Sequence, residues 1–233
     1  MRTQALLVVA LMAGVTAACS DGSPAVPQAA GPFSAHADSG GTQHDEFVLV
    51  SGVSSLRVVM ADTGKNLFEA ASPSGAAVRP VVVTDPSQVR LDLVSTGLNG
   101  ASEVDVQLSS SVLWQVTVDG GTTDASLDLR GGTVSGVDVV GGTSHLDLTV
   151  PAPKGTMTVR ESGGVSALSL HAAAAVPAQV RFSGGAGTAT IDGAARSGVS
   201  GGTTVTPTGW AAATNKYDIE LDAGVSSFVL DRP

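Results

Sequence analysis

Apolar and polar positions alternate along most of this chain, and the alternation recurs in one short phrase. The phrase has a glycine, then small residues, and then an apolar, a polar and an apolar position. It begins at six glycines: Gly52, Gly121, Gly142, Gly164, Gly185 and Gly224. The position between its two apolar residues holds Arg57, Ser126, Asp147, Ser169, Thr190 and Val229. Because a period of two residues is typical of a strand with one buried face, each phrase predicts a β-strand whose middle position faces outward.

A second alternating stretch precedes each phrase. Five residues before the glycine, every copy is apolar: Phe47, Val116, Val137, Val159, Val180 and Ile219. Two residues later the position is apolar again, except at Glu161. Each unit is therefore a strand, a glycine corner and a strand, since a sharp bend between stacked strands demands glycine. Units of about twenty residues predict an all-β fold, either a β-solenoid or a sandwich of stacked rungs, with no significant helix beyond a signal peptide.

Two intervals between phrases are longer than one unit. Residues 197–209 predict a degenerate rung in the second interval, and residues 78–83, 89–94 and 104–108 predict three further strands in the first. A terminal rung exposes unpaired backbone groups, so the ends of the stack need protection. The last three residues, Asp231, Arg232 and Pro233, place charge and a proline beside the final strand, and we expect them to form a cap.

The first residues have the pattern of an export signal. A basic residue, Arg2, precedes an apolar run from Ala5 to Ala18 that is short for a membrane span, and small residues end the run just before Cys19. This arrangement resembles the lipobox of bacterial lipoproteins, in which the cysteine receives acyl chains such as palmitate. Thr16 stands where that motif most often has leucine.

Cys19 is the only cysteine in the chain, so an intrachain disulfide is excluded. Lipidation at Cys19 would explain a lone cysteine at this boundary; the alternative is an ordinary secreted protein. We expect residues 1–18 to form a lipoprotein signal peptide, residues 19–43 to form the lipidated cysteine and a flexible Ser-, Ala-, Gly- and Pro-rich tether, and residues 44–233 to form the solenoid domain. The protein would then be anchored to the outer side of the cell membrane by its lipid.

Charge and composition exclude one class of partner. Removal of Arg2 leaves 11 basic and 21 acidic side chains, a formal charge of −10, and aromatic residues make up 3% of the chain. A nucleic-acid binder needs basic patches and stacking aromatics. We therefore expect no nucleic-acid partner.

No pattern predicts a catalytic, metal or cofactor site. Asp92, Asp128 and Asp147 each stand between two leucines, where strand alternation by itself predicts an outward polar residue. The four histidines, His36, His44, His145 and His171, show no metal-ligand spacing. A glycan lyase would need clustered basic and acidic residues, and its candidates are Arg160, Arg181 and Arg196, which fall in different rungs and could approach one another.

Trp114 and Trp210 are the candidates for contact with a partner. They are the two tryptophans of an aromatic-poor chain. Each could pack over the end of a rung, or it could form a platform for carbohydrate stacking or protein contact. An exposed Trp210 would favour the platform.

The C-terminal residues carry a family resemblance. Trp210 is followed by Tyr217-Asp218-Ile219 and then by the segment 223–227, Ala-Gly-Val-Ser-Ser. Together with the glycine doublets and the VPAPKG turn at residues 150–155, this run resembles the toastrack, or putative adhesin, domain family, which is related to the C-terminal domain of cell-wall-stress regulators. The resemblance covers about residues 44–233. It implies the fold and a location in the cell envelope, and it implies no catalytic activity.

These features predict a cell-envelope lipoprotein that acts as a non-enzymatic binding or scaffold module, without a cofactor. Its partners would be the membrane, through the lipid anchor, and an envelope protein or cell-wall glycan. One alternative is a component of an envelope-stress signalling pathway, and another is a glycan-cleaving enzyme.

Overall fold

The computed structural model describes residues 32–85 and 88–233 of the chain. The expected signal peptide, Cys19 and most of the expected tether lie outside the described residues. Across the described ranges the structure consists of strands and one 3-10 turn, η1 (Trp210–Ala212). None of these elements is a helix with the length and apolar character needed to cross a bilayer.

The strands form two sheets, named sheet A and sheet B here. In spatial order, sheet A contains β1 (Phe33–Asp38), β4 (Asn66–Ser72), β7 (Glu103–Ser109), β3 (Val53–Ala61), β9 (Thr122–Asp128), β11 (Thr143–Thr149), β13 (Val165–His171), β19 (Val225–Asp231), β15 (Ala186–Ile191) and β16 (Ala194–Val199). Sheet B contains β17 (Thr203–Val205), β14 (Ala178–Phe182), β18 (Lys216–Leu221), β12 (Thr156–Glu161), β10 (Thr133–Val139), β8 (Leu113–Val118), β2 (His44–Leu49), β6 (Gln88–Ser95) and β5 (Val78–Asp85).

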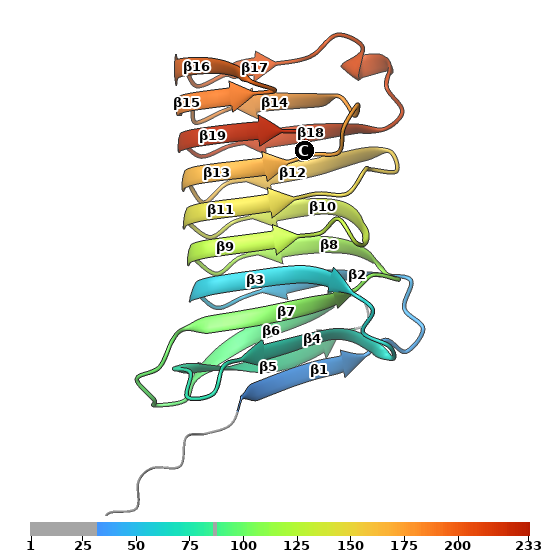
Figure 1. Cartoon of the computed structure of the whole chain (residues 1–233), viewed down its shortest axis with the longest axis vertical. Coiled ribbons are helices and arrows are strands. Elements are labelled where there is room, and N and C mark those ends of the chain that lie inside the picture. The colour runs from blue at the N-terminus through green and yellow to red at the C-terminus, as the bar shows by residue number, and fades with distance from the viewer. Residues whose placement is uncertain (1–31, 86–87) are drawn as a thin grey trace, which may run out of the picture.

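Each rung has one strand in sheet B, a glycine corner and one strand in sheet A, as the repeat predicts. Successive rungs pair in parallel, so that β9, β11 and β13 lie side by side in one sheet while β8, β10 and β12 do so in the other. The rungs stack along the long axis of the molecule (Figure 1). The predicted all-β, solenoid-like fold of Gly-cornered rungs is confirmed.

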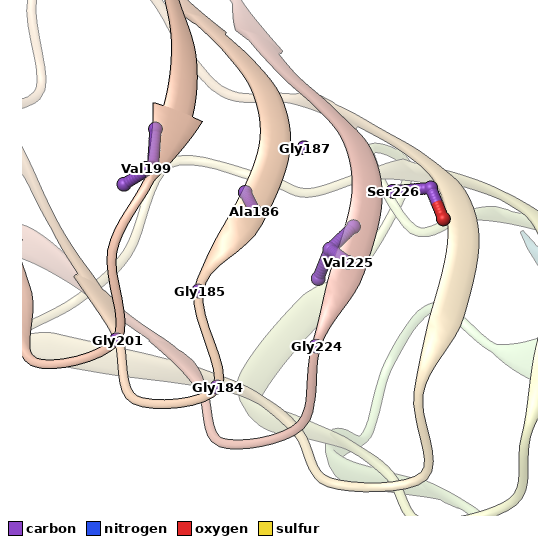
Figure 2. A pocket seen from close by; sticks show the side chains of 9 residues that line it. All are labelled: Gly184, Gly185, Ala186, Gly187, Val199, Gly201, Gly224, Val225 and Ser226. Carbon is purple, nitrogen blue, oxygen red and sulfur yellow. The ribbon is translucent and has the colours of Figure 1, made fainter.

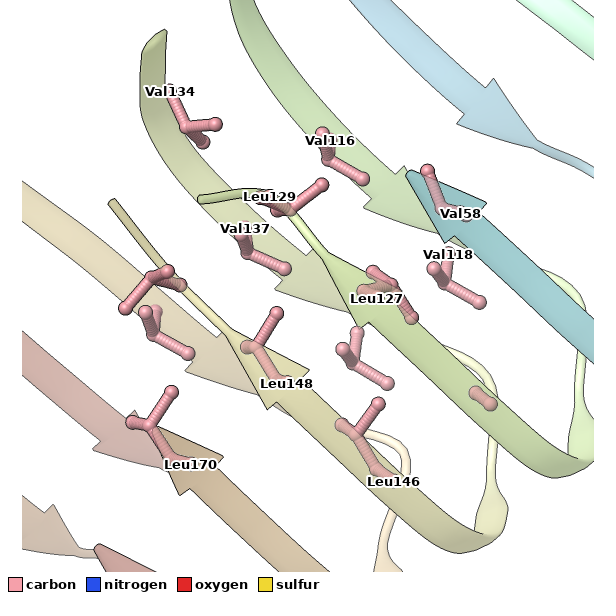
Figure 3. Packing of buried hydrophobic residues seen from close by; sticks show 14 of the residues in the cluster. Val58, Val116, Val118, Leu127, Leu129, Val134, Val137, Leu146, Leu148 and Leu170 are labelled. Atoms are coloured by element: carbon pink, nitrogen blue, oxygen red, sulfur yellow. The ribbon is translucent and has the colours of Figure 1, made fainter. Parts of the chain in front are cut away.

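The apolar positions of both strands meet between the two sheets. Val116 and Val137 from sheet B lie opposite Leu127, Leu148 and Leu170 from sheet A, and all five are almost fully buried (Figure 3). Burial of one such side chain contributes about 1.5–3 kcal/mol. Because every rung adds another pair of inward rows, the core runs the length of the stack.

The spatial order of the rungs differs from their order in the sequence at both ends. The last rung, β18–β19, lies between β12–β13 and β14–β15, and the first rung, β2–β3, lies between β6–β7 and β8–β9. The expectation that the C-terminal residues cap the stack is therefore wrong. Asp231 and Arg232 lie beside an interior strand, where they pair with His171 and Asp192.

Antiparallel strands close the two ends instead. At one end β4 pairs antiparallel with β7 and β5 with β6, and at the other end β16 pairs antiparallel with β15 and β17 with β14. The predicted strands at 78–83, 89–94 and 104–108 correspond to β5, β6 and β7. The degenerate rung predicted at 197–209 exists, but it begins earlier and runs in the opposite direction. Because these strands run in the opposite direction, the parallel stack of rungs ends there.

Strand β1 lies inside the segment expected to be a tether. It pairs antiparallel with β4, and its residues alternate between half-buried and exposed, with Ala37 packed against the core. The sheets of the solenoid therefore include residues before 44, namely β1 from Phe33 to Asp38. The prediction failed here because the strand is built mainly from small and polar residues, whose composition resembles that of a linker.

The glycine corners are the tightest points of the stack. A β-carbon on Gly141 would lie 2.5 Å from the carbonyl carbon and oxygen of Gly120, and a β-carbon on Gly163 would lie 2.2 Å from the carbonyl oxygen of Val140. The backbone N–H of Gly141 donates to the carbonyl of Val118 in the adjacent rung at 3.1 Å. Glycine is required here because backbone from one rung occupies the space that a side chain of the next would need.

We expect Gly141→Ala to lower the free energy of unfolding by about 1–3 kcal/mol, because the added methyl group forces two rungs apart. Urea denaturation followed by circular dichroism measures the change. Gly121→Ala is the matched control, since a β-carbon there would lie 3.4 Å from the nearest atom, the carbonyl oxygen of Gly142. It should change stability by less than about 1 kcal/mol. Equal losses from both variants would contradict the argument from close approach.

Candidate binding surface

The outer face of sheet A carries a shallow trough over β3, β9, β11 and β13. Its volume is about 380 Å³. The side chains along its floor are short, and they include Ser126, Ala167 and Ser169. In the register of the sheet, Arg57, Ser126, Asp147 and Ser169 lie side by side on consecutive strands. The sequence predicted this outward row, and the structure confirms it.

Charged side chains stand among the short ones on the same strands. Nδ1 of His145 lies 3.1 Å from a carboxylate oxygen of Asp124, and both side chains are largely exposed. Asp147 and Arg57 also line the trough and are exposed. The face therefore offers cationic, anionic and hydroxyl groups on a rigid, flat support.

His171 lies beyond the trough, at the end of β13, between carboxylates from the two neighbouring strands. Its Nδ1 is 2.5 Å from Oδ1 of Asp231 on β19, and its Nε2 is 3.6 Å from Oδ2 of Asp147 on β11. Burial lowers the pKa of His171, but the hydrogen bond and charge of Asp231, with the charge of Asp147, outweigh this effect and raise the pKa above its usual value. The pair joins an inserted C-terminal strand to its neighbour.

The sequence did not reveal this contact. Asp231 and His171 are 60 residues apart, and they become neighbours only because β19 is inserted beside β13. The repeat places both residues at the same position, at the ends of their strands. It does not show that these two strands are neighbours, because it does not give the order of the rungs.

The three leucine-flanked aspartates all face outward, as predicted. Asp128 pairs with Arg130 at 2.7 Å, and this hydrogen bond lowers the pKa of Asp128. Asp92 accepts a hydrogen bond from the hydroxyl of Ser51. In the ranges 32–85 and 88–233, no group of three or more His, Cys, Asp or Glu side chains is placed to hold a metal ion.

Around the inserted rung, the outer face of sheet B over β12, β18 and β14 carries a network of ion pairs. Arg181 on β14 contacts Asp218 and Glu220 on β18, and Arg160 on β12 lies 2.7 Å from Asp222. The hydrogen bond from Arg160 lowers the pKa of Asp222. These arginines are thus matched by carboxylates of the inserted rung.

The three arginines considered for a glycan-cleaving site do not form one cluster. Arg160 and Arg181 lie on sheet B, whereas Arg196 lies on β16 at the edge of sheet A. The expectation that all three could approach one another is wrong, because alternate strands of the repeat belong to opposite sheets.

Glu161 is the acidic exception in an inward apolar row, and it is almost fully buried. Burial raises the pKa of Glu161, although backbone N–H groups of Gly164, Ala223 and Gly163 act in the opposite direction. Since Ala223 belongs to the inserted rung, Glu161 joins the corners of two rungs that are distant in sequence. Its contacts are with the protein backbone, which indicates a structural role.

Neither tryptophan forms an open platform. Trp114 is fully buried, and its Nε1 donates to the carbonyl of Ser109 at 2.9 Å, so it is not available for contact with a partner. Trp210 is half-buried in η1; its Nε1 donates to the carbonyl of Tyr217 at 2.8 Å. The ammonium of Lys216 covers the ring at 4.7 Å from its centroid. Trp210 therefore fastens the loop before the last rung, and part of its surface remains accessible.

A hollow of about 490 Å³ lies at the glycine corners beside β15 and β16. Figure 2 shows that its wall consists of glycine backbone with the small side chains of Ala186, Val199, Val225 and Ser226. None of its lining residues carries an ionisable side chain, and Ser226 supplies its hydroxyl group. The hollow exists because the glycines at the corners have no side chains. It offers a partner fewer polar and charged groups than the trough on sheet A does.

Comparison with known proteins identifies the class of fold. No protein-family profile matches the sequence, and no curated protein matches it. The chain is similar to the crystal structure of a putative cell adhesion protein from Clostridium sporogenes, with a TM-score of 0.62 and 13% identity over 87% of this chain and 99% of that chain. A putative adhesin from Bacteroides fragilis covers 85% of this chain and 96% of its own, with 12% identity and a TM-score of 0.30. The chain thus has the β-solenoid-like fold of the Clostridium protein.

We expect the free energy of unfolding to decrease as the pH rises from the unfolded-state pKa of histidine, about 6.5, through the raised folded-state pKa of His171. The folded-state pKa of His171 is raised, so the stabilisation by Asp231 is fully present below the unfolded-state pKa and is lost as the pH rises through the folded-state value. Asp231→Asn should remove most of this slope in urea titrations. Asp124→Asn, at a carboxylate that does not contact His171, is the control; an unchanged slope in Asp231→Asn would contradict the assignment.

Proposed function

We propose that the protein is an exported lipoprotein whose solenoid domain binds another protein of the cell envelope without catalysing a reaction. The observation that carries this proposal is the trough on sheet A. It is a rigid, open surface on which parallel strands hold short polar side chains and charged side chains in register on neighbouring strands. Such a surface suits recognition of an extended partner better than enclosure of a small molecule.

The arrangement of the titratable groups supports binding over catalysis. His145 and His171 are each paired with aspartates, and the serines of the trough floor lie on other outward positions. Nucleophilic catalysis requires a base within hydrogen-bond reach of the nucleophile. The structurally similar Clostridium sporogenes protein is a putative cell adhesion protein, which agrees with a binding role.

The burial of aromatic residues favours a protein partner over a glycan. Six of the eight aromatic side chains are buried in the core: Phe47, Phe68, Phe182, Phe228, Tyr217 and Trp114. Phe33 and Trp210 are half-buried, and Trp210 is held by Tyr217 and Lys216. Carbohydrate stacking requires an aromatic face open to solvent. Trp210 remains the residue on which a glycan alternative would depend.

The location rests on Cys19, which lies outside the described residues. We expect a metabolically supplied alkynyl fatty acid to label the native protein and not Cys19→Ala. The membrane fraction should contain the labelled protein. Labelling of both forms would contradict lipidation at Cys19, whereas secretion of an unlabelled native chain would indicate an ordinary exported protein.

The partner can be captured by crosslinking the tagged native protein in cells and identifying what is bound. Ser126→Arg combined with Ser169→Arg fills the trough, and we expect capture of the partner to fall roughly tenfold, which corresponds to about 1.4 kcal/mol. Gln179→Arg on the outer face of sheet B is the matched control and should capture normally. Thermal unfolding confirms that each variant folds. Undiminished capture by the double variant would exclude the trough as the binding site. Capture of cell-wall glycan alone would favour the glycan alternative, in which Trp210 is the contact residue.

A further inference from the structure

Asn99 and Gly100 lie in the loop 96–102, which joins β6 to β7 at the end of the stack that contains β1 and β5. An Asn-Gly pair most often forms a tight hairpin turn, in which both residues have a positive φ. Here neither residue has a positive φ, and β6 and β7 belong to opposite sheets. A hairpin turn therefore does not explain why glycine follows asparagine in this loop.

Close packing explains the glycine. A β-carbon on Gly100 would lie 1.9 Å from the carbonyl oxygen of Gly75 and 2.7 Å from its carbonyl carbon. Gly75 belongs to the turn 73–77 between β4 and β5, so two loops of the stack end meet backbone to backbone at this point. A side chain on residue 100 would push the two loops apart. The residue after Asn99 is thus the one that leaves its peptide nitrogen least shielded.

The amide group of Asn99 is open to solvent. Residues 97–100 are all exposed. Within the ranges 32–85 and 88–233, the side chain of Asn99 makes no hydrogen bond, and neither does the backbone N–H of Gly100. Asparagine is among the chemically labile residues of proteins. The side-chain amide carbon and the peptide nitrogen that follows it are therefore free of competing hydrogen bonds.

The other two asparagines of the chain are held by hydrogen bonds. Nδ2 of Asn66 donates to Oε1 of Glu69 at 2.7 Å. Oδ1 of Asn215 accepts from the backbone N–H of Gly155 at 2.9 Å. The backbone N–H that follows Asn215, that of Lys216, donates to the carbonyl of Gly155 at 3.0 Å. These bonds restrain both amides and also the peptide nitrogen that follows the second one.

We propose that Asn99 is a site of spontaneous deamidation, in which water converts its side-chain amide to a carboxylate. The peptide nitrogen of Gly100 attacks Cγ of Asn99 and forms a new C–N bond, while the bond from Cγ to Nδ2 breaks. The proton of the peptide nitrogen leaves with Nδ2 as ammonia. Water then opens the five-membered imide, at Cγ to give aspartate or at the main-chain carbonyl to give isoaspartate. This modification depends neither on the proposed anchor nor on binding at the trough.

Isoaspartate would loosen this end of the stack. The loop is fixed to the turn 73–77 on both sides of Asn99, because the N–H of Thr96 donates to the carbonyl of Ala77 at 2.9 Å and the N–H of Ala77 donates to the carbonyl of Ala101 at 2.9 Å. Isoaspartate adds a methylene group to the backbone between these two bonds, so it lengthens a segment whose ends are fixed. Aspartate adds only the charge. We expect these two hydrogen bonds to open more often in the isoaspartate form.

The test incubates the full chain in water enriched in heavy oxygen at mildly alkaline pH, which speeds the reaction because the attacking nitrogen must lose its proton. Peptide mapping by mass spectrometry detects the labelled carboxylates. We expect Asn99 to be converted at a rate within several-fold of that of the isolated peptide 94–104, while Asn66 and Asn215 remain amides. Asn99→Gln is the matched control and should not be labelled, since its longer side chain closes a less favourable six-membered ring.

Conversion of the isolated peptide while Asn99 of the folded chain stays an amide would overturn the proposal, because the fold would then protect this loop. Conversion of Asn66 or Asn215 as fast as Asn99 would also overturn it, since the reaction would not depend on the features of this loop. Circular dichroism before and after the incubation verifies that the chain remains folded.

The effect on the stack end is measured on the isoaspartate form, which is separated by anion exchange and identified by fragmentation in the mass spectrometer. Hydrogen–deuterium exchange at the N–H of Ala77 should be several-fold faster in this form than in the native chain. Freshly prepared Asn99→Asp, which carries the charge without the methylene group, is the matched control and should exchange as the native chain does. Equal exchange in all three proteins would refute the loosening of the stack end.

Discussion

Contact between backbones at the glycine corners is the constraint on which the rest of the structure depends. Adjacent strands in a sheet lie about 4.8 Å apart, and here two sheets must keep this spacing around a shared bend. At the bend, the backbone of one rung occupies the position where the next rung would place a β-carbon, as at Gly120 and Gly141. The stack can close only if side chains are absent there. Once the corners fit, every other position of a rung lies in register with its neighbours, and the inward and outward rows follow.

The permuted order of the rungs turns this repetitive arrangement into a single, bounded body. The first and last rungs are interior, and reversed strands terminate the stack at both ends. Strand β18 pairs with β12 in sheet B and β19 pairs with β13 in sheet A, so the C-terminal residues complete both sheets. Glu161, His171 and Arg160 join the inserted rung to β12 and β13. These contacts are specific to one position in the stack, which explains why the final rung is inserted there and not elsewhere.

The two outer faces and the two ends offer different surfaces. On the outer face of sheet B, the charged side chains over β12, β18 and β14 pair with one another, whereas the trough of sheet A leaves polar groups open to a partner. The end that contains β1 and β5 carries the exposed valines Val83 and Val94. The core is continuous from rung to rung, so the two ends and the trough belong to one rigid body.

The sequence by itself determined the rung. Alternation specified strands, the doublets specified corners, and the phrase specified which residues face outward, including the row that contains Arg57, Ser126 and Asp147. It did not determine the order of the rungs, since each rung presents nearly the same edges and differs only at positions such as Glu161. For the same reason it concealed the pairing of His171 with Asp231. It also misplaced the start of the domain, because the small residues of β1 form a strand only when β4 lies beside them. Local periodicity is encoded over a few residues, whereas neighbours in a stack are chosen by contacts among residues far apart in the chain, which only the tertiary structure brings together.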